Sequence, residues 1–286
     1  MCRGISGVLT RNVRDLKDRV TWQSALAELL GTCILIVIGT GTCIGKDWEA
    51  NTPTIVQISL TFGLAVATVV RCIGHVSGGH INPAVTCAML ATRRVTLSKA
   101  IIYIVSQCLG AIIGSAIVMA ITPADYMGDL GQTSVSSSIK AFPRAVAVEA
   151  FITFVLIFTI FASCDANRHD LSGSTPLSIG FAVAFCHMFA IKYTGSSMNP
   201  ARTFGPAVVG GTWEHHWVYW IGPITGAIFA GLIYEFIFAS NATPAKMRKY
   251  FSDPDYVGDR IFVHSIESNG HHDGHSDDVK KLNDRV

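Results

Sequence analysis

The stretch GHVSGGHINPAVT, residues 74–86, and the stretch SMNPAR, residues 197–202, decide the fold of this chain. Both contain the triplet Asn-Pro-Ala, at residues 82–84 and 199–201. Asparagine caps a helix through its side-chain oxygen, and proline at the first helical position loses no hydrogen bond, because that N–H has no partner within the helix. Each triplet therefore predicts the start of a helix, with the asparagine NH₂ left free to donate into a cavity.

The sequence around the triplets is strongly apolar. Of 286 residues, 50% are hydrophobic and 15% charged, whereas a soluble domain carries about 25% charged residues. A bilayer core needs roughly 20 apolar residues as helix, and six segments meet this length, at about residues 22–44, 54–73, 97–121, 144–163, 176–193 and 216–239. The chain is therefore predicted to be an all-α membrane protein with six transmembrane helices. The net charge of +2 gives no sign of a nucleic-acid partner.

Two further apolar segments, residues 82–90 and 199–209, begin at the triplets and are too short to span. Short segments of this kind predict re-entrant half-helices. Such backbone is stable at membrane depth only where protein covers it or where it lines a watery cavity. A cavity is therefore expected where the two half-helices lie.

Basic residues near the ends of the segments predict the orientation, because cytoplasmic loops are enriched in lysine and arginine. With both termini in the cytoplasm, the residues on that side are Arg11, Arg14, Lys17, Arg19, Arg93, Arg94, Lys99, Arg168, Lys246, Arg248 and Lys249. The opposite side then carries Lys46, Lys140 and Arg144. Residues 1–21 form a cytoplasmic lead-in, and the polar tail, residues 240–286, is predicted to be largely disordered.

The channel-forming part, residues 22–239, contains an internal duplication, with one copy at 22–121 and the other at 144–239. Glu28 and Glu149 occupy matching places in the first helix of each copy, and Asn199 follows Asn82 by 117 positions. Three spanning helices per copy force the second copy to enter from the opposite face, which predicts an inverted repeat with its site at the bilayer midplane.

The two half-helices are then expected to meet head to head, and each N-terminus carries about half a positive charge. A cation at the meeting point is repelled. Glu28 and Glu149 are expected to accept hydrogen bonds from the loop backbones, because buried polar backbone must be paired. A proton-relay role for the two acids is the alternative.

Residues 74–86 and 197–202 resemble the two signature loops of the major intrinsic protein family, and the resemblance extends over about residues 20–240. The whole is most similar to the water-selective animal aquaporins of that family. The resemblance implies a homotetramer in a lipid bilayer, a pore for water in each subunit, and a plasma-membrane location. It also implies no enzyme activity, no cofactor and no metal.

The resemblance further implies a pore constriction formed by Phe62, His187, Ser196 and Arg202. Without it, Phe62 would be interpreted as lipid-facing and His187 as a core histidine. Relatives that conduct glycerol carry a small residue at the histidine position and Asp after the arginine, whereas this chain has His187 and Thr203. Thr203 departs mildly from the Ser or Ala of water channels.

His75 is expected near the cytoplasmic mouth, either as a pH sensor or as a structural residue. Two other functions stay open at this point. One is a glycerol or small-solute facilitator of the same family, and the other is a membrane scaffold or adhesion protein with a closed pore. An enzyme is disfavoured, because no serine–histidine pair or metal-ligand set lies at matched depth in the sequence.

Overall fold

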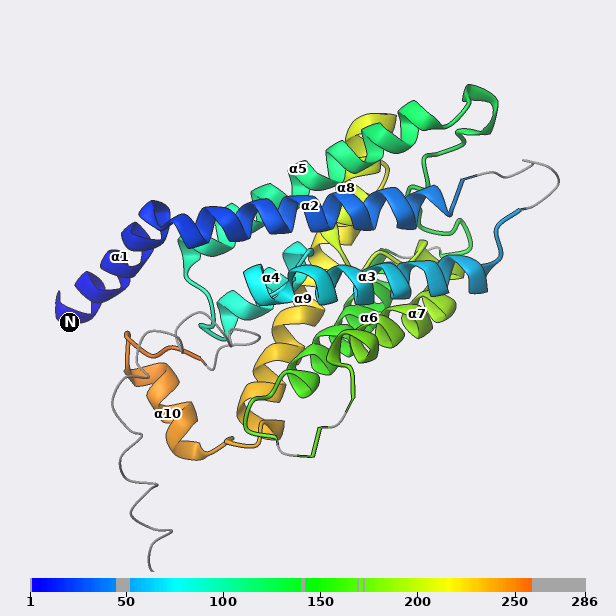
Figure 1. Cartoon of the computed structure of the whole chain (residues 1–286). Helices are drawn as coiled ribbons and strands as arrows, with labels where there is room; N and C mark the ends of the chain where they lie inside the picture. Colours follow the sequence, from blue (N-terminus) through cyan, green and yellow to red (C-terminus); the bar gives the residue numbers. More distant parts are fainter. Residues whose placement is uncertain (1, 45–51, 140–141, 169, 172, 259–286) are drawn as a thin grey trace, which may run out of the picture.

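The structure is a computed structural model that describes residues 2–44, 52–139, 142–168, 170–171 and 173–258. Within these ranges the chain forms helices and no strands. In chain order the elements are α1 (Cys2–Lys17), α2 (Arg19–Gly41), α3 (Ile55–Ser77), α4 (Pro83–Ala91), α5 (Leu97–Ile121), η2 (Ala124–Tyr126), α6 (Phe142–Ser163), α7 (Thr175–Thr194), α8 (Pro200–Gly210), α9 (Val218–Ile233), η3 (Tyr234–Phe238) and α10 (Pro244–Ser252). Figure 1 shows a bundle of long helices with α1 and α10 at the same end.

Six helices of the described residues are long and apolar enough to cross a membrane: α2, α3, α5, α6, α7 and α9 with its continuation η3. They match the six predicted segments to within a few residues. The short helices α4 and α8 begin directly after Asn82 and Asn199, which cap them. The predicted all-α fold with six spanning helices and two half-helices is confirmed.

Small residues set how closely the spanning helices pack. A Cβ on Gly110 of α5 would lie 2.2 Å from the Leu29 carbonyl oxygen of α2, and one on Gly226 of α9 would lie 2.0 Å from the Ala150 carbonyl oxygen of α6. The duplicated glycines therefore serve helix crossings inside one chain, since no side chain fits there. They hold α2 against α5 and α6 against α9, and so position the loops that follow α3 and α7.

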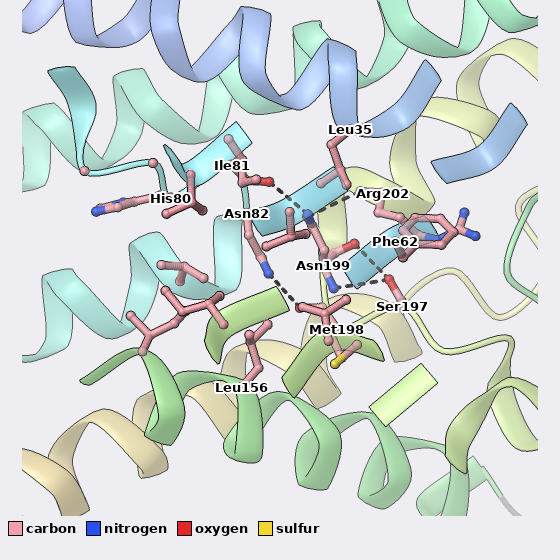
Figure 2. A pocket seen from close by; sticks show the side chains of 18 of the residues that line it. Leu35, Phe62, His80, Ile81, Asn82, Leu156, Ser197, Met198, Asn199 and Arg202 are labelled. Atoms are coloured by element: carbon pink, nitrogen blue, oxygen red, sulfur yellow. Dashed lines mark hydrogen bonds between the residues drawn. The ribbon is translucent and has the colours of Figure 1, made fainter. Parts of the chain in front are cut away.

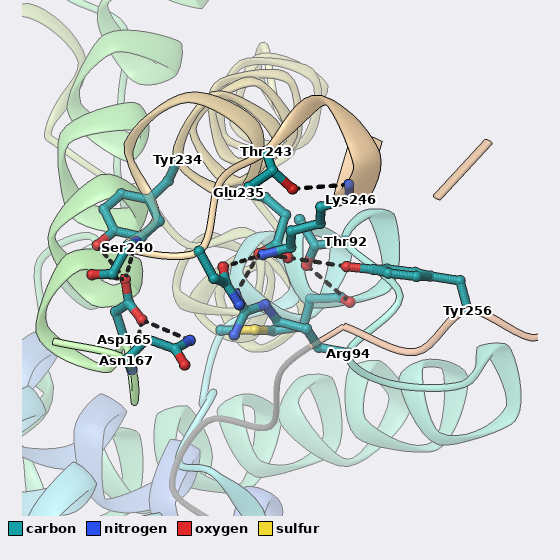
Figure 3. Close-up of polar contacts among 12 residues, drawn as sticks. Thr92, Arg94, Asp165, Asn167, Tyr234, Glu235, Ser240, Thr243, Lys246 and Tyr256 are labelled. Carbon is teal, nitrogen blue, oxygen red and sulfur yellow. Dashed lines mark hydrogen bonds and ion pairs between the residues drawn. The ribbon is translucent and has the colours of Figure 1, made fainter. Parts of the chain in front are cut away.

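The tail differs in part from its prediction. Residues 244–252 form the helix α10, although disorder is predicted for the segment from residue 240 onward. Three contacts order it: the Thr243 hydroxyl caps Lys246 N–H at 3.1 Å, the Lys246 ammonium pairs with the buried Glu235 at 2.7 Å, and the Tyr250 hydroxyl donates to the Ala91 carbonyl at 2.6 Å. Figure 3 shows Glu235, Thr243 and Lys246 of this cluster at the end of α9. Residues 259–286, the rest of the predicted disordered tail, lie outside the described residues.

A second polar cluster in Figure 3 lies at the same end of the bundle. The Asp165 carboxylate accepts hydrogen bonds from the Tyr234 hydroxyl at 3.1 Å and from the Ser240 N–H at 3.0 Å. It also accepts the Asn167 N–H at 3.0 Å. Asp165, which follows α6, therefore connects α6 by hydrogen bonds to the residues at the end of α9 and η3.

Candidate functional site

The N-termini of α4 and α8 face each other, and their capping asparagines join them. Asn82 Nδ2 donates to the Met198 carbonyl at 2.8 Å, and Asn199 Nδ2 donates to the Ile81 carbonyl at 2.9 Å. Figure 2 shows the two side chains reaching across to the opposite loop. One N–H of each amide is used in this cross-contact, so the prediction of a wholly free NH₂ is wrong. The second N–H of each amide remains for the cavity.

The side-chain oxygens of the same asparagines cap their own helices. Asn82 Oδ1 accepts the Ala84 N–H at 2.8 Å, and Asn199 Oδ1 accepts the Ala201 N–H at 3.0 Å. The remaining triplet residues, Pro83, Ala84, Pro200 and Ala201, form the buried first turns of the half-helices and do not line the cavity. Their role in the structure is to start the helices at these points.

The loops that carry the asparagines have an unusual backbone. Ile81 has a φ of 45° and Met198 a φ of 54°, and Ser196 has a φ of 55°. Side chains with a Cβ are disfavoured in this left-handed region, at a cost of about 1–3 kcal/mol each. Such a conformation persists only where surrounding contacts impose it, and the two buried glutamates provide those contacts.

Glu28 holds the first loop. Its Oε1 accepts the Ser77 hydroxyl at 2.6 Å and the His80 N–H at 2.9 Å, and its Oε2 accepts the Ile81 N–H at 2.6 Å. Gln107 adds a further bond at 2.8 Å. Glu28 is fully buried and does not line the cavity, so its carboxylate is occupied in supporting the loop.

Glu149 holds the second loop in the same way. It accepts the Thr194 hydroxyl at 2.6 Å, the Ser197 N–H at 3.0 Å and the Met198 N–H at 2.9 Å. It is also fully buried and outside the cavity lining. Both acids therefore make the predicted bonds to loop backbone, and their positions do not favour the alternative of a proton relay.

Sequence reasoning missed Gln107 and two matched pairs of residues in this support. Besides Ser77 and Thr194, the Tyr103 hydroxyl donates to the Ser77 carbonyl at 2.8 Å, and the Tyr219 hydroxyl donates to the Thr194 carbonyl at 2.7 Å. Thr194 follows Ser77 by 117 positions and Tyr219 follows Tyr103 by 116. The spacing of the duplication was thus a signal that could have found the two pairs.

A narrow cavity of about 50 Å³ passes between the asparagines. One water molecule needs roughly 10–15 Å³ of this kind of volume, so the cavity has room for a few. Apolar side chains such as Leu35, Leu156 and Val183 form much of its wall, and loop residues and a few polar or aromatic helix residues form the rest. Among the loop residues is His80, which sequence reasoning did not single out; its Nδ1 lies 3.1 Å from the Thr86 hydroxyl.

Three of the four predicted constriction residues meet at one end of this cavity. The rings of Phe62 and His187 stack with centroids 4.7 Å apart, and the Arg202 guanidinium carbon lies 4.9 Å from the Phe62 centroid. Figure 2 shows Phe62 and Arg202 together at the end opposite His80. All three side chains are buried and line the cavity.

Hydrogen bonds fix two of these side chains. Arg202 Nη1 donates to the Gly131 carbonyl at 2.7 Å, and His187 Nδ1 lies 3.0 Å from the Val183 carbonyl. Within the described residues, His187 Nε2 and Arg202 Nε have no hydrogen-bond partner. Beside the cavity, the constriction thus holds polar groups that the protein itself does not satisfy.

Ser196, the fourth predicted residue, is fully buried beside the constriction but does not line the cavity. The structure gives a role to Thr203, which departs from the Ser or Ala of water channels. Its hydroxyl lies 2.7 Å from both the Thr133 hydroxyl and the Ser197 hydroxyl. The segment between α5 and α6 is therefore tied to the turn that carries Arg202, through Thr133 as well as Gly131.

The structure places His75 next to the narrow passage but not among the residues that line it. It is exposed on α3 and lines a second, open cavity of about 780 Å³, together with Arg71 and residues 173–176. This cavity adjoins the narrow passage, because Val70 lines both.

Comparison with known proteins agrees with this geometry. The family model described as major intrinsic protein matches residues 15–234. Aquaporin-4 of Mus musculus is 52% identical over 219 residues, which cover 76% of this chain and 68% of that protein. Aquaporin-2 of Homo sapiens is 45% identical over 223 residues, covering 78% and 81%. The X-ray structure of the aquaglyceroporin from Plasmodium falciparum has a TM-score of 0.67 at 22% identity, covers 76% of this chain and 96% of its own, and supports the fold alone.

Proposed function

The chain belongs to the major intrinsic protein family, and we propose that water crosses it passively, in single file, through the cavity between the two asparagine loops. The chain is an integral membrane protein and a water channel, not an enzyme, as its similarity to aquaporin-4 and aquaporin-2 indicates. The observation that carries the proposed route is the reciprocal contact of Asn82 and Asn199 beside a cavity of about 50 Å³, which has room for a few water molecules.

Charge supports a barrier to ions and protons on this route. The positive ends of α4 and α8 point at the same place from opposite sides, and each carries about half a charge. The Arg202 guanidinium adds a permanent charge at the constriction. Exclusion of cations and protons by an arginine and by half-helix dipoles is the general explanation for aquaporin-type pores, and the residues for it are Asn82, Asn199 and Arg202.

The constriction supports selectivity for water over glycerol. Phe62 and His187 stack at 4.7 Å and occupy the side of the passage that faces Arg202. Glycerol needs a wider opening and an apolar surface for its carbon chain, whereas this opening is narrowed by an imidazole. A glycerol facilitator is therefore the second candidate, and a scaffold with a closed pore is the third.

The assembly and orientation are part of the proposal. We place both termini in the cytoplasm, because the basic residues Arg93, Arg94, Arg168 and Lys246 lie at the end of the bundle where α1 and α10 lie, and such residues are enriched in cytoplasmic loops. We also propose a homotetramer in the plasma membrane. Exposed apolar rows on α3 and α7, which include Leu64 and Phe185, support contact with other subunits or with lipid.

Stopped-flow light scattering of vesicles that contain the purified chain tests the function. A sucrose gradient measures water flux, a glycerol gradient measures glycerol flux, and an enclosed pH-sensitive dye measures proton leak. We expect water flux far above that of empty vesicles, with glycerol and proton flux at their level. Glycerol flux comparable to that of water would favour the facilitator, and water flux equal to that of empty vesicles would favour the closed scaffold.

A further inference from the structure

The first helix, α1, turns its polar side toward the rest of the protein. Asn12 Oδ1 accepts hydrogen bonds from the Ser98 N–H at 2.8 Å and from its hydroxyl at 2.9 Å. The Asp15 carboxylate accepts the Thr96 hydroxyl. These contacts attach one side of α1 to the start of α5, and Figure 1 shows α1 turning away from the line of α2 at that end of the bundle.

A second side of α1 is apolar and exposed. Leu9 is 63% exposed, Val13 42% and Leu16 49%. These positions recur at the spacing of one helix face. A helix on the surface of a soluble protein buries its apolar face and exposes its polar face, and α1 does the reverse. Its apolar face therefore fits an apolar environment outside the described part of the chain.

The helix that follows, α2, also has an exposed apolar surface. Val20, Leu26 and Leu30 of α2 are exposed in the same way, on a helix that is long and apolar enough to span a membrane. Trp22 joins the two helices, since its indole N–H donates to the Leu16 carbonyl at 3.0 Å. Tryptophan is enriched where membrane meets water, so the junction of α1 and α2 lies at that boundary.

Charge at the junction identifies the kind of surface. Arg14, Lys17 and Arg19 are exposed there, while Arg11 pairs with Asp255 at 3.1 Å. Under the proposed orientation, these cations lie on the cytoplasmic side, where the leaflet carries anionic lipids. A helix with one apolar side and a cationic polar side binds in the plane of such a surface.

We propose that α1 is a membrane-surface helix that binds anionic lipids of the cytoplasmic leaflet. Leu9, Val13 and Leu16 enter the region of the acyl chains, and Arg14 and Lys17 contact the lipid phosphates. The polar contacts with α5 set the depth of the helix. The assignment to the cytoplasmic leaflet rests on the proposed orientation. The burial of the apolar face of α1 in lipid does not depend on that orientation.

The test places an environment-sensitive fluorescent amino acid in the full chain, at Leu9 or at Thr10, which is exposed on a different side of α1. The protein is reconstituted in nanodiscs of phosphatidylcholine, alone or mixed with phosphatidylserine. Quenching by brominated acyl chains reports contact with lipid, and quenching by iodide reports contact with water. We expect the probe at Leu9 to be several-fold more sensitive to brominated lipid than the probe at Thr10, with the reverse order for iodide.

Phosphatidylserine should increase this contrast, and the double variant Arg14→Gln/Lys17→Gln should lose the increase. Equal access of iodide to both probes would overturn the proposal. A probe at Leu9 shielded from iodide yet insensitive to brominated lipid would also overturn it, and would indicate a second copy of the chain. A wild-type protein whose contrast does not change with phosphatidylserine would reject the anionic partner. Water flux of the same variants in vesicles shows separately whether the pore works.

Discussion

Replacement of Glu149 by glutamine tests whether a buried carboxylate holds the second asparagine loop. Oε1 of Glu149 accepts two hydrogen bonds, from Thr194 and Ser197, and Oε2 accepts the Met198 N–H at 2.9 Å. Glutamine retains one oxygen but sets an NH₂ group against that N–H, so two donors face each other. The variant keeps the size of the side chain, and its effect therefore reports hydrogen bonding and charge.

The cost follows from these contacts. A buried N–H without an acceptor costs about 1–3 kcal/mol, and each of the two remaining bonds loses about 1 kcal/mol when its acceptor is no longer charged. The sum is about 3–5 kcal/mol of unfolding free energy. Met198 is held at a φ of 54°, and without its bond it should relax and displace Asn199.

Thermal unfolding in detergent and water flux in vesicles measure the outcome. We expect Glu149→Gln to lower the melting temperature by roughly 10 °C, at roughly 2–4 °C per kcal/mol, and to reduce water flux. The matched control is Glu214→Gln, whose parent side chain is 79% exposed and which should change neither quantity. A Glu149→Gln protein with normal melting and normal flux would refute the role assigned to the carboxylate.

Three further predictions concern other parts of the chain. His187→Ala should raise glycerol flux while water flux continues, because the imidazole that narrows the passage is gone; unchanged exclusion of glycerol would mean that the constriction is misassigned. Gly226→Ala should cost about 1–3 kcal/mol or more from overpacking, because its Cβ would lie 2.0 Å from the Ala150 carbonyl oxygen, whereas Gly41→Ala meets open space and should melt normally. Burial alone would raise the pKa of Asp165, but its hydrogen bonds lower that pKa overall, so this carboxylate stabilises the fold above its unfolded pKa of about 4. The melting difference between wild type and Asp165→Asn should therefore be largest near neutral pH and shrink as the pH falls below about 4, and a constant difference would contradict the sign.

The asparagine triplets predicted the half-helices because their signals act within a few residues. The duplication predicted the arrangement of the two halves because the copies can be compared directly in the sequence. A cap, a proline and a run of apolar residues specify a half-helix with little help from the rest of the chain. By contrast, α1 and α10 are short helices whose stability depends on distant contacts. Asn12 needs Ser98, and Lys246 needs Glu235, and neither pairing leaves a pattern in the sequence.

The candidate site was predictable to a different degree in its two parts. The support by Glu28 and Glu149 follows from the rule that buried backbone must be paired, together with the duplication. The constriction came from family resemblance, because no periodicity links Phe62 with His187. The hydroxyl contact of Thr203 with Thr133 required coordinates, since the segment before α6 has no repeat counterpart that could reveal it.

The reciprocal contacts of Asn82 and Asn199 also set an order of events while the chain is being made. A ribosome adds about 5–20 residues per second, so Met198 follows Asn82 by on the order of 10 s. Throughout that interval the first loop lacks both partners from the second loop. These are the Met198 carbonyl, which accepts from Asn82, and the Asn199 amide, which donates to the Ile81 carbonyl. The nascent first half is therefore expected to wait, with its loop sheltered or outside the bilayer core, until the second half arrives and both loops enter together.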